Sequence, residues 1–225
     1  MSSRTENTVA GVDGAKGKWV IARFDGDRVD WTVEHDAESV LAATASCTTV
    51  GVDMPLTMPT KGYRASEVEA KIFLGPARSS IFHTPVHAAV EATSYADACV
   101  ISRDITGKAI SMQTWHLMPA IRSWQSISFD TERVVEVHPE CSFRLMAPDV
   151  TFASKKSGRG AGQRMAALSR WVDPHNLADG LARLPVGPAL DDALDAAAAA
   201  WSAWRFSRGE HRSFGTTDSS DRIVA

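Results

Sequence analysis

The pattern that most constrains the fold is an apolar run that ends in Gly-Val-Asp, and it occurs twice. Residues 9–12 lead into Asp13, and residues 50–52 lead into Asp53. Short continuous apolar runs are typical of buried strands. A carboxylate is costly to bury without a partner, so two acids at equivalent strand ends indicate that a cation lies between them.

The segment between these two acids predicts a meander of strands followed by a helix. Gly14 and Gly17 are typical of a turn, and residues 19–22 form a second apolar run. Residues 28–34 alternate apolar and polar, as a half-buried third strand does. The alanine-rich segment 37–45 predicts a short helix that leads into the fourth strand at residues 50–52.

The rest of the chain is mainly helical in its pattern. Valine-rich residues 134–137 predict one further strand. Pro119 is expected to kink its helix or to start a new turn. The last helix is favoured by Pro188 near its start, by acids in its first turns and by a run of alanines. The predicted helices cover residues 64–75, 95–107, 110–125, 163–171, 173–184 and 188–206.

Length and composition indicate one soluble globular domain. The chain has 225 residues, 44% of them hydrophobic and 23% charged, which is ordinary for a domain with its own core. We expect a single domain over residues 1–210. The polar segment 211–225 is expected to be a flexible tail.

Other features of the sequence bear on the compartment. No apolar run approaches the roughly 20 residues that a membrane helix needs. The first residues resemble no signal peptide, so a cytoplasmic location and no membrane partner are expected. Cys47, Cys99 and Cys141 are widely spaced and odd in number, which favours reduced thiols over disulfides or a zinc site.

Charge limits the class of partner. A formal net charge of -3 is not typical of a protein that grips long duplex DNA through many phosphates. A short, structured or single-stranded nucleic acid, held by a local basic patch, stays compatible with it.

A third acidic element lies on the last helix. Asp192 and Asp195 are three residues apart and Asp191 and Asp195 are four apart, so each pair shares a helix face. Like charges at this spacing repel, and carboxylates that converge from strands and a helix suit Mg²⁺ or Mn²⁺. For Asp191, a favourable interaction with the helix dipole is an equal alternative.

The last predicted strand adds polar residues near the same place. Glu136, His138 and Glu140 follow one another at the end of this strand, where ligands bind in parallel sheets. We predict that they surround the acids. His138 is either a proton shuttle or a structural histidine.

Basic residues are candidates for holding an anionic substrate. The glycine-rich loop at residues 153–164 lacks the GxxxxGK[ST] pattern, so it is not a P-loop, but its lysines can approach phosphate as point charges. A solvated surface loop is the alternative for each residue. The candidate substrate-binding residues are Arg64, Arg78, Lys155, Lys156 and Arg164.

The order of these elements resembles the ribonuclease H-like superfold. More closely, the chain is similar to domain-of-unknown-function family 429, whose members are described as predicted RNase H-like nucleases. It departs from the family pattern at Ser66, where an acid is often found, and carries Glu67 next to it. The matching stretches are GVDGAKGKWVIA, VGVDMPLTMP, LGPARSSIFHTP, GKAISMQTW, VVEVHPECSF, SKKSGRGAGQR and DDALDAAAAAW.

The resemblance implies an α/β fold and a reaction. The fold is a mixed five-stranded sheet with helices on its faces and a largely helical insertion, at about residues 55–133, between strands 4 and 5. The reaction is two-metal phosphodiester hydrolysis with Mg²⁺ or Mn²⁺. Asp13 would bridge both ions, Asp53 would complete one site, and Asp192 with Asp195 the other.

Two alternatives stay open on the same fold. One is a module that binds nucleic acid, nucleotide or protein without cutting it. The other is nucleotide phosphoryl transfer, as in actin-like ATPases and sugar kinases, which need two such domains around the nucleotide. Fold alone does not decide among them.

Overall fold

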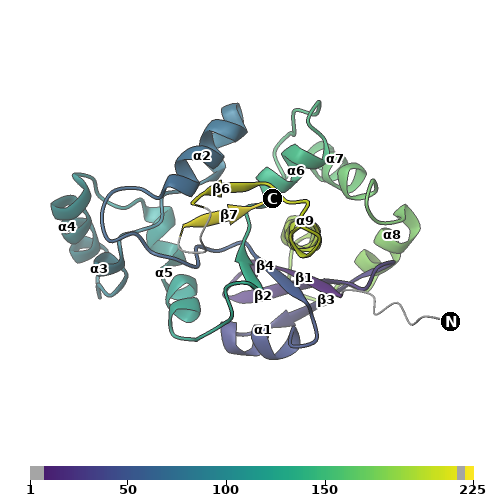
Figure 1. The fold of residues 1–225 in the computed structure, drawn as a ribbon, viewed down its shortest axis with the longest axis horizontal. Helices are drawn as coiled ribbons and strands as arrows, with labels where there is room; N and C mark the ends of the chain where they lie inside the picture. Colours follow the sequence, from purple (N-terminus) through teal and green to yellow (C-terminus); the bar gives the residue numbers. More distant parts are fainter. Residues whose placement is uncertain (1–7, 217–220) are drawn as a thin grey trace.

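The computed structural model describes residues 8–216 and 221–225, and a five-stranded mixed sheet lies at its centre (Figure 1). The strand order is β3-β2-β1-β4-β5. β1 is antiparallel to β2 and parallel to β4, and β4 is parallel to β5. The predicted α/β fold is confirmed and is consistent with a ribonuclease H-like arrangement. The strands are β1 (Val9–Ala15), β2 (Lys18–Phe24), β3 (Val29–Glu34), β4 (Thr49–Val52) and β5 (Val134–Glu136).

The chain between β4 and β5 forms the predicted helical insertion. Pro119 lies inside α5, which continues through it as one helix. The insertion contains α2 (Ala65–Leu74), the 3₁₀ helix η1 (Gly75–Ser80), α3 (His87–Val90), α4 (Tyr95–Thr106) and α5 (Met112–Gln125). The other helices are α1 (Ala37–Ala43), α6 (Pro139–Met146), α7 (Gly158–Leu168), α8 (Pro174–Ala182) and α9 (Leu190–Ser207).

One predicted helix starts earlier than expected. α7 begins at Gly158, five residues before the predicted start, because the Ser157 hydroxyl accepts a hydrogen bond from the Gly160 N–H and caps the helix. Gly158 and Gly160 lie in the first turn of α7, and glycine favours a loop over a helix. The cap overrides their low helix propensity.

The prediction of a flexible tail at residues 211–225 is wrong for the described part of that segment. β6 (Ser213–Gly215) and β7 (Arg222–Val224) form an antiparallel hairpin beside α2 (Figure 1). Phe214 and Ile223 are buried against α2, and Val224 bridges to Val137 beyond β5. A few apolar residues at the right positions therefore fix a segment whose average composition is polar.

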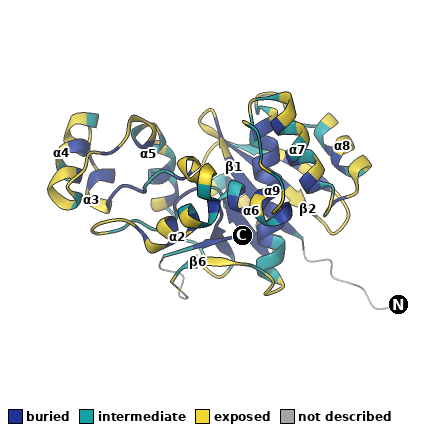
Figure 2. Cartoon of the chain, turned by 90° about the horizontal axis from the view of Figure 1, so that it is seen from above, coloured by how far each residue is buried: buried dark blue, intermediate teal, exposed yellow. Residues whose placement is uncertain are grey.

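α9 packs directly on the centre of the sheet. A Cβ on Gly11 would lie 2.0 Å from the Ala200 N, and one on Gly51 would lie 2.6 Å from the Ala199 O. Glycine in the strands and alanine in the helix thus allow a close backbone approach, and α9 is buried along most of its length (Figure 2). α1 and α5 cover the opposite face. None of the helices in the described parts of the chain has the length and apolar content to cross a membrane.

Replacing Gly11 with alanine is expected to lower the free energy of unfolding by about 3 kcal/mol or more, because the new methyl would overlap the α9 backbone. Denaturant unfolding measures the change. Gly162→Ala is the matched control: it lies on α7 with nothing within 4 Å, so it should gain roughly 0.5–1 kcal/mol. Equal, small effects of the two changes would contradict this packing.

Candidate functional site

A cavity of about 360 Å³ lies at the carboxyl ends of β1, β4 and β5. Its charged lining is mostly acidic and comes from the sheet, the insertion, α6, α9 and the loop before α7. Carboxylates crowded in a protein interior are stabilised either by protonation, which raises their pKa values, or by nearby cations. The charged and titratable residues that line it are Asp13, Asp53, Glu67, Glu136, His138, Glu140, Lys155 and Asp195.

The parallel pairing of β1 and β4 brings two of the predicted acids together. Val12 is in register with Val52, and the Asp53 N–H donates to the Val12 carbonyl at 2.8 Å. Asp13, which lies inside β1, and Asp53, which directly follows β4, are therefore at the same level on adjacent strands, as the repeated Gly-Val-Asp pattern predicts. Asp195 reaches the same cavity from α9.

Burial raises the pKa of all three carboxyl groups, and neighbouring carboxylates add to the rise. Burial, followed by the charges of Asp53 and Asp195, holds the pKa of Asp13 well above its usual value. Burial and the Asp195 charge raise the pKa of Asp53 to about 8, although Lys155 and a hydrogen bond with Asp13 oppose the shift. Burial also raises the pKa of Asp195 to about 6, against the influence of Lys155. Negative charge in the cavity is thus only partly compensated.

Lys155 supplies the compensating charge among these acids. Its Nζ lies 2.5 Å from the Asp195 Oδ2. Burial alone would lower the pKa of this lysine, but Asp195, Asp13 and Asp53 together raise it above its ordinary value. Lys155 was predicted to hold a substrate anion, and the structure places it against carboxylates.

The other two acids of α9 do not point to the same place. Asp192 accepts a hydrogen bond from the Ala189 N–H at 2.9 Å and so caps the helix. The Asp191 Oδ2 lies 2.5 Å from the Nζ of the exposed Lys156. Neither acid is among the described residues that line the cavity. Of the predicted pair, only Asp195 lines the cavity, while Asp192 acts on Asp13 as a nearby negative charge.

The residues present fit a hard divalent cation in charge and in donor type. The Asp195 Oδ1 is buried and makes no hydrogen bond with any described residue, so this oxygen is available as a metal ligand. Carboxylate oxygens are the ligands that Mg²⁺ and Mn²⁺ prefer. Across residues 8–216 and 221–225, no three acidic, His or Cys side chains stand grouped as a ready ligand set. The Lys155 ammonium lies among them instead.

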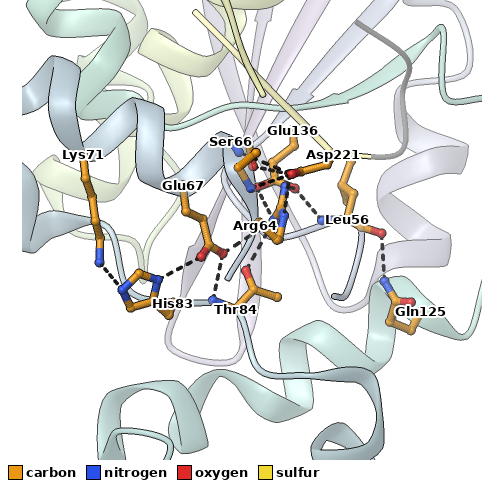
Figure 3. A network of polar contacts seen from close by, with 11 residues as sticks. Leu56, Arg64, Ser66, Glu67, Lys71, His83, Thr84, Gln125, Glu136 and Asp221 are labelled. Carbon is orange, nitrogen blue, oxygen red and sulfur yellow. Dashed lines mark hydrogen bonds and ion pairs between the residues drawn. The ribbon is translucent and has the colours of Figure 1, made fainter. Parts of the chain in front are cut away.

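Glu136 and Arg64 form a buried ion pair beside the cavity (Figure 3). Arg64 donates to both carboxylate oxygens, at 2.8 and 2.9 Å, and the Leu56 N–H donates to one of them. Arg64 also pairs with Asp221 at 3.1 Å. Burial raises the pKa of Glu136, and Arg64 opposes this rise. Arg64, predicted to hold substrate, is 4% exposed and joins α2 to β5 and to the C-terminal hairpin.

Glu140 and Arg164 form a second ion pair beside the cavity. Arg164 Nη2 lies 2.5 Å from the Glu140 carboxylate, and its guanidinium lies over the rings of Phe143 and Phe152. Arg164 is 2% exposed, so its guanidinium is buried against Glu140 and the two rings. A buried guanidinium with these partners orients the acid that lines the cavity.

His138 lines the cavity, and Arg78 is not among the described residues that line it. Burial lowers the pKa of His138 to about 4, and its Nε2 lies 3.4 Å from the Ser80 carbonyl. The imidazole is therefore neutral near pH 7 and offers a hydrogen bond, not a positive charge. Arg78 is exposed on η1, whose last residue Ser80 lines the cavity.

Glu67 is the functional candidate that sequence patterns did not single out. It is 2% exposed, lines the cavity, and accepts a hydrogen bond from the Thr84 N–H at 2.8 Å. The Ser66 hydroxyl beside it contacts Asp221, so the C-terminal hairpin supplies a carboxylate to α2 (Figure 3). The spacing of Arg64 and Glu67, three apart on one helix, is the signal that links Glu67 to the cavity.

Asp53 makes the stability of the metal-free protein depend on pH. Its pKa in the folded state, about 8, is above the usual value of 3.8, so its contribution is complete below about pH 4 and is lost as the pH rises to about 8. Asp53→Asn cannot ionise. Near pH 8, in the presence of a chelator, the variant should be more stable than wild type by on the order of 5 kcal/mol.

Urea unfolding at about pH 5 and about pH 8 measures this difference. The exposed Asp104→Asn on α4 is the control and should change stability equally little at both values. The raised pKa of Asp53 would be contradicted if wild type became more stable between about pH 5 and about pH 8 and Asp53→Asn changed by the same amount.

Comparison with known proteins gives one match. No curated protein and no solved structure matches the chain. The family model described as "Protein of unknown function (DUF429)" matches residues 11–219, a range that includes all the acids lining the cavity. The chain therefore belongs to the DUF429 family of proteins of unknown function.

Proposed function

We propose that this protein is a metal-dependent hydrolase that cuts phosphodiester bonds in a nucleic acid. The observation that carries the proposal is the convergence of Asp13, Asp53 and Asp195 on one cavity in which their negative charge is only partly compensated. The ribonuclease H-like order of strands supports the reaction class. Short or single-stranded nucleic acid suits the net charge of -3.

Asp13, Asp53 and Asp195 would hold the Mg²⁺ or Mn²⁺. When bound, such a cation lowers the pKa of an attacking water and stabilises the departing oxygen. Asp192 stays outside the ligand set, because it caps α9. The Arg64–Glu136 and Arg164–Glu140 pairs fix the cavity walls, and the neutral His138 contacts the Ser80 carbonyl.

The cytoplasm is the compartment that we propose for this activity. Cys47, Cys99 and Cys141 are all buried free thiols, as expected in a reducing environment. Buried thiols of this kind are structural, and burial raises the pKa of Cys47 and Cys141. None of them is assigned a role in the reaction.

A non-catalytic binding module is the second candidate, and one observation favours it. The carboxylates form no ready-made metal ligand set within the described residues, and Lys155 already neutralises part of their charge. Nucleotide phosphoryl transfer needs two domains of this kind around the nucleotide, and the described residues form one five-stranded sheet.

Asp13→Asn is expected to abolish the thermal stabilisation of the protein by Mn²⁺ together with any Mn²⁺-dependent cleavage of labelled oligonucleotides. A ligand that binds only the folded state stabilises it by about 2.7 kcal/mol at 100 times its Kd. The wild-type melting temperature should therefore rise with Mn²⁺. Asp104→Asn, an exposed acid on α4, should respond as wild type does. Equal responses of wild type and Asp13→Asn would sink the metal site.

Lys155→Met is expected to tighten Mn²⁺ binding by about tenfold or more, because the ammonium and the metal compete for the same carboxylates. Calorimetric titration measures the Kd. Lys156→Met is the matched control: its ammonium pairs with Asp191 outside the cavity and is 70% exposed, so the Kd should not change. Weaker Mn²⁺ binding by Lys155→Met would show that the lysine supports the site and does not compete for it.

A further inference from the structure

A second cavity, of about 440 Å³, lies wholly within the insertion. The η1–α3 loop, α2, α4 and α5 form its walls. It adjoins the acidic cavity, because Phe82, Thr84 and Gln113 line both. The reaction proposed above assigns it no role.

The charge of the two cavities is opposite. Among the described residues that line the second cavity, none is Asp or Glu, whereas the first has six such acids. Lys71 and Lys108 lie in its wall together with several hydroxyl side chains. An acid-free cavity with two ammonium groups attracts an anion, and it lies directly beside the site where a phosphodiester would be cut.

An aromatic ring stands at the same place. Tyr63 is 41% exposed and stacks on His83, with ring centroids 3.8 Å apart and planes 21° from parallel. The Lys108 Nζ lies 5.6 Å from the Tyr63 ring centroid. A half-exposed aromatic ring next to ammonium groups is the combination that proteins use to hold unstacked bases and their phosphates.

Lys71 is held in position by a chain of contacts that starts at the acidic cavity (Figure 3). The Glu67 carboxylate lies 3.1 Å from the His83 Nδ1, and the His83 Nε2 lies 3.0 Å from the Lys71 Nζ. An ammonium group can only donate, so Nε2 accepts and Nδ1–H donates to Glu67. This tautomer fixes both the ring under Tyr63 and the ammonium at the cavity wall.

We propose that the second cavity binds a single-stranded nucleic-acid segment and leads it to the acidic site. Lys71 and Lys108 contact a phosphate, and Tyr63 stacks on a base. A base in a duplex is already stacked and paired, so only an unpaired strand can offer it to the ring. This inference rests on the proposed hydrolase function only in saying that the bound strand leads to the acidic site. Binding itself can be measured without cleavage.

The test is fluorescence anisotropy with a labelled single strand of about 12 nucleotides, in the presence of a chelator so that no metal-dependent cleavage occurs. Tyr63→Ala should raise the Kd roughly tenfold, and Tyr63→Phe, which keeps the ring, should bind as wild type does. Lys108→Ala should weaken binding and flatten the slope of log K against log[salt] by about 0.7, as loss of one phosphate contact does. All these side chains are at the surface, so the variants should fold.

Lys61→Ala is the matched control, since Lys61 is exposed two residues from Tyr63 but is not among the described residues lining the cavity. The inference is overturned if wild type binds no single strand, if Tyr63→Ala and Lys108→Ala bind as wild type does, or if Lys61→Ala weakens binding equally. Competition by the matching duplex, or by a mononucleotide, at the same concentration as the single strand would also overturn it.

The failure of this inference and the failure of the hydrolase are distinguishable. Binding that depends on Tyr63 and Lys108, without any Mn²⁺-dependent cleavage, supports the single-strand site and removes the hydrolase. Cleavage that Asp13→Asn abolishes, with binding that none of the cavity variants alters, keeps the hydrolase and removes the single-strand site.

Discussion

The close approach of α9 to β1 and β4 is the constraint on which the rest of the structure depends. Gly11 and Gly51 leave no Cβ between strand and helix, and alanines on α9 face them. Any larger side chain at these places would push the helix outward. This contact carries Asp195 to the ends of the two strands, so the packing of the core and the composition of the acidic cavity have one cause.

The same contact brings several carboxylates together, and Lys155 compensates part of their negative charge. Carboxylates from β1, β4 and α9 meet where water is largely excluded, and their pKa values rise in consequence. Lys155 enters from the loop before α7 and pairs with Asp195. A divalent cation bound in the cavity would therefore have to replace, at least in part, the charge that Lys155 supplies.

The C-terminal hairpin fixes the insertion against the sheet. Asp221 binds Arg64 and Ser66 at the start of α2, while Arg64 holds Glu136 at the end of β5. Breaking a buried pair of this kind leaves an uncompensated charge, so the network resists partial opening. The network also positions α2, which carries Glu67, and the Glu67 carboxylate contacts His83. Glu67 lines the acidic cavity and His83 lines the cationic one, so this contact lies between the two cavities.

The sequence by itself determined the sheet, the helical insertion and the meeting of Asp13 with Asp53, because strand periodicity and a repeated Gly-Val-Asp pattern are local signals that parallel pairing converts directly into proximity. The spacing on the last helix also predicted Asp195 near these two acids, and Asp195 lines the same cavity. The cap that Asp192 makes on α9 is also a local contact, with the N–H three residues before it. Only the tertiary structure decided that Arg64 and Arg164 are buried in ion pairs, and that Ser213–Gly215 pairs with Arg222–Val224. These outcomes depend on which partner lies within a few ångströms across distant segments, and spacing along one chain does not contain that information.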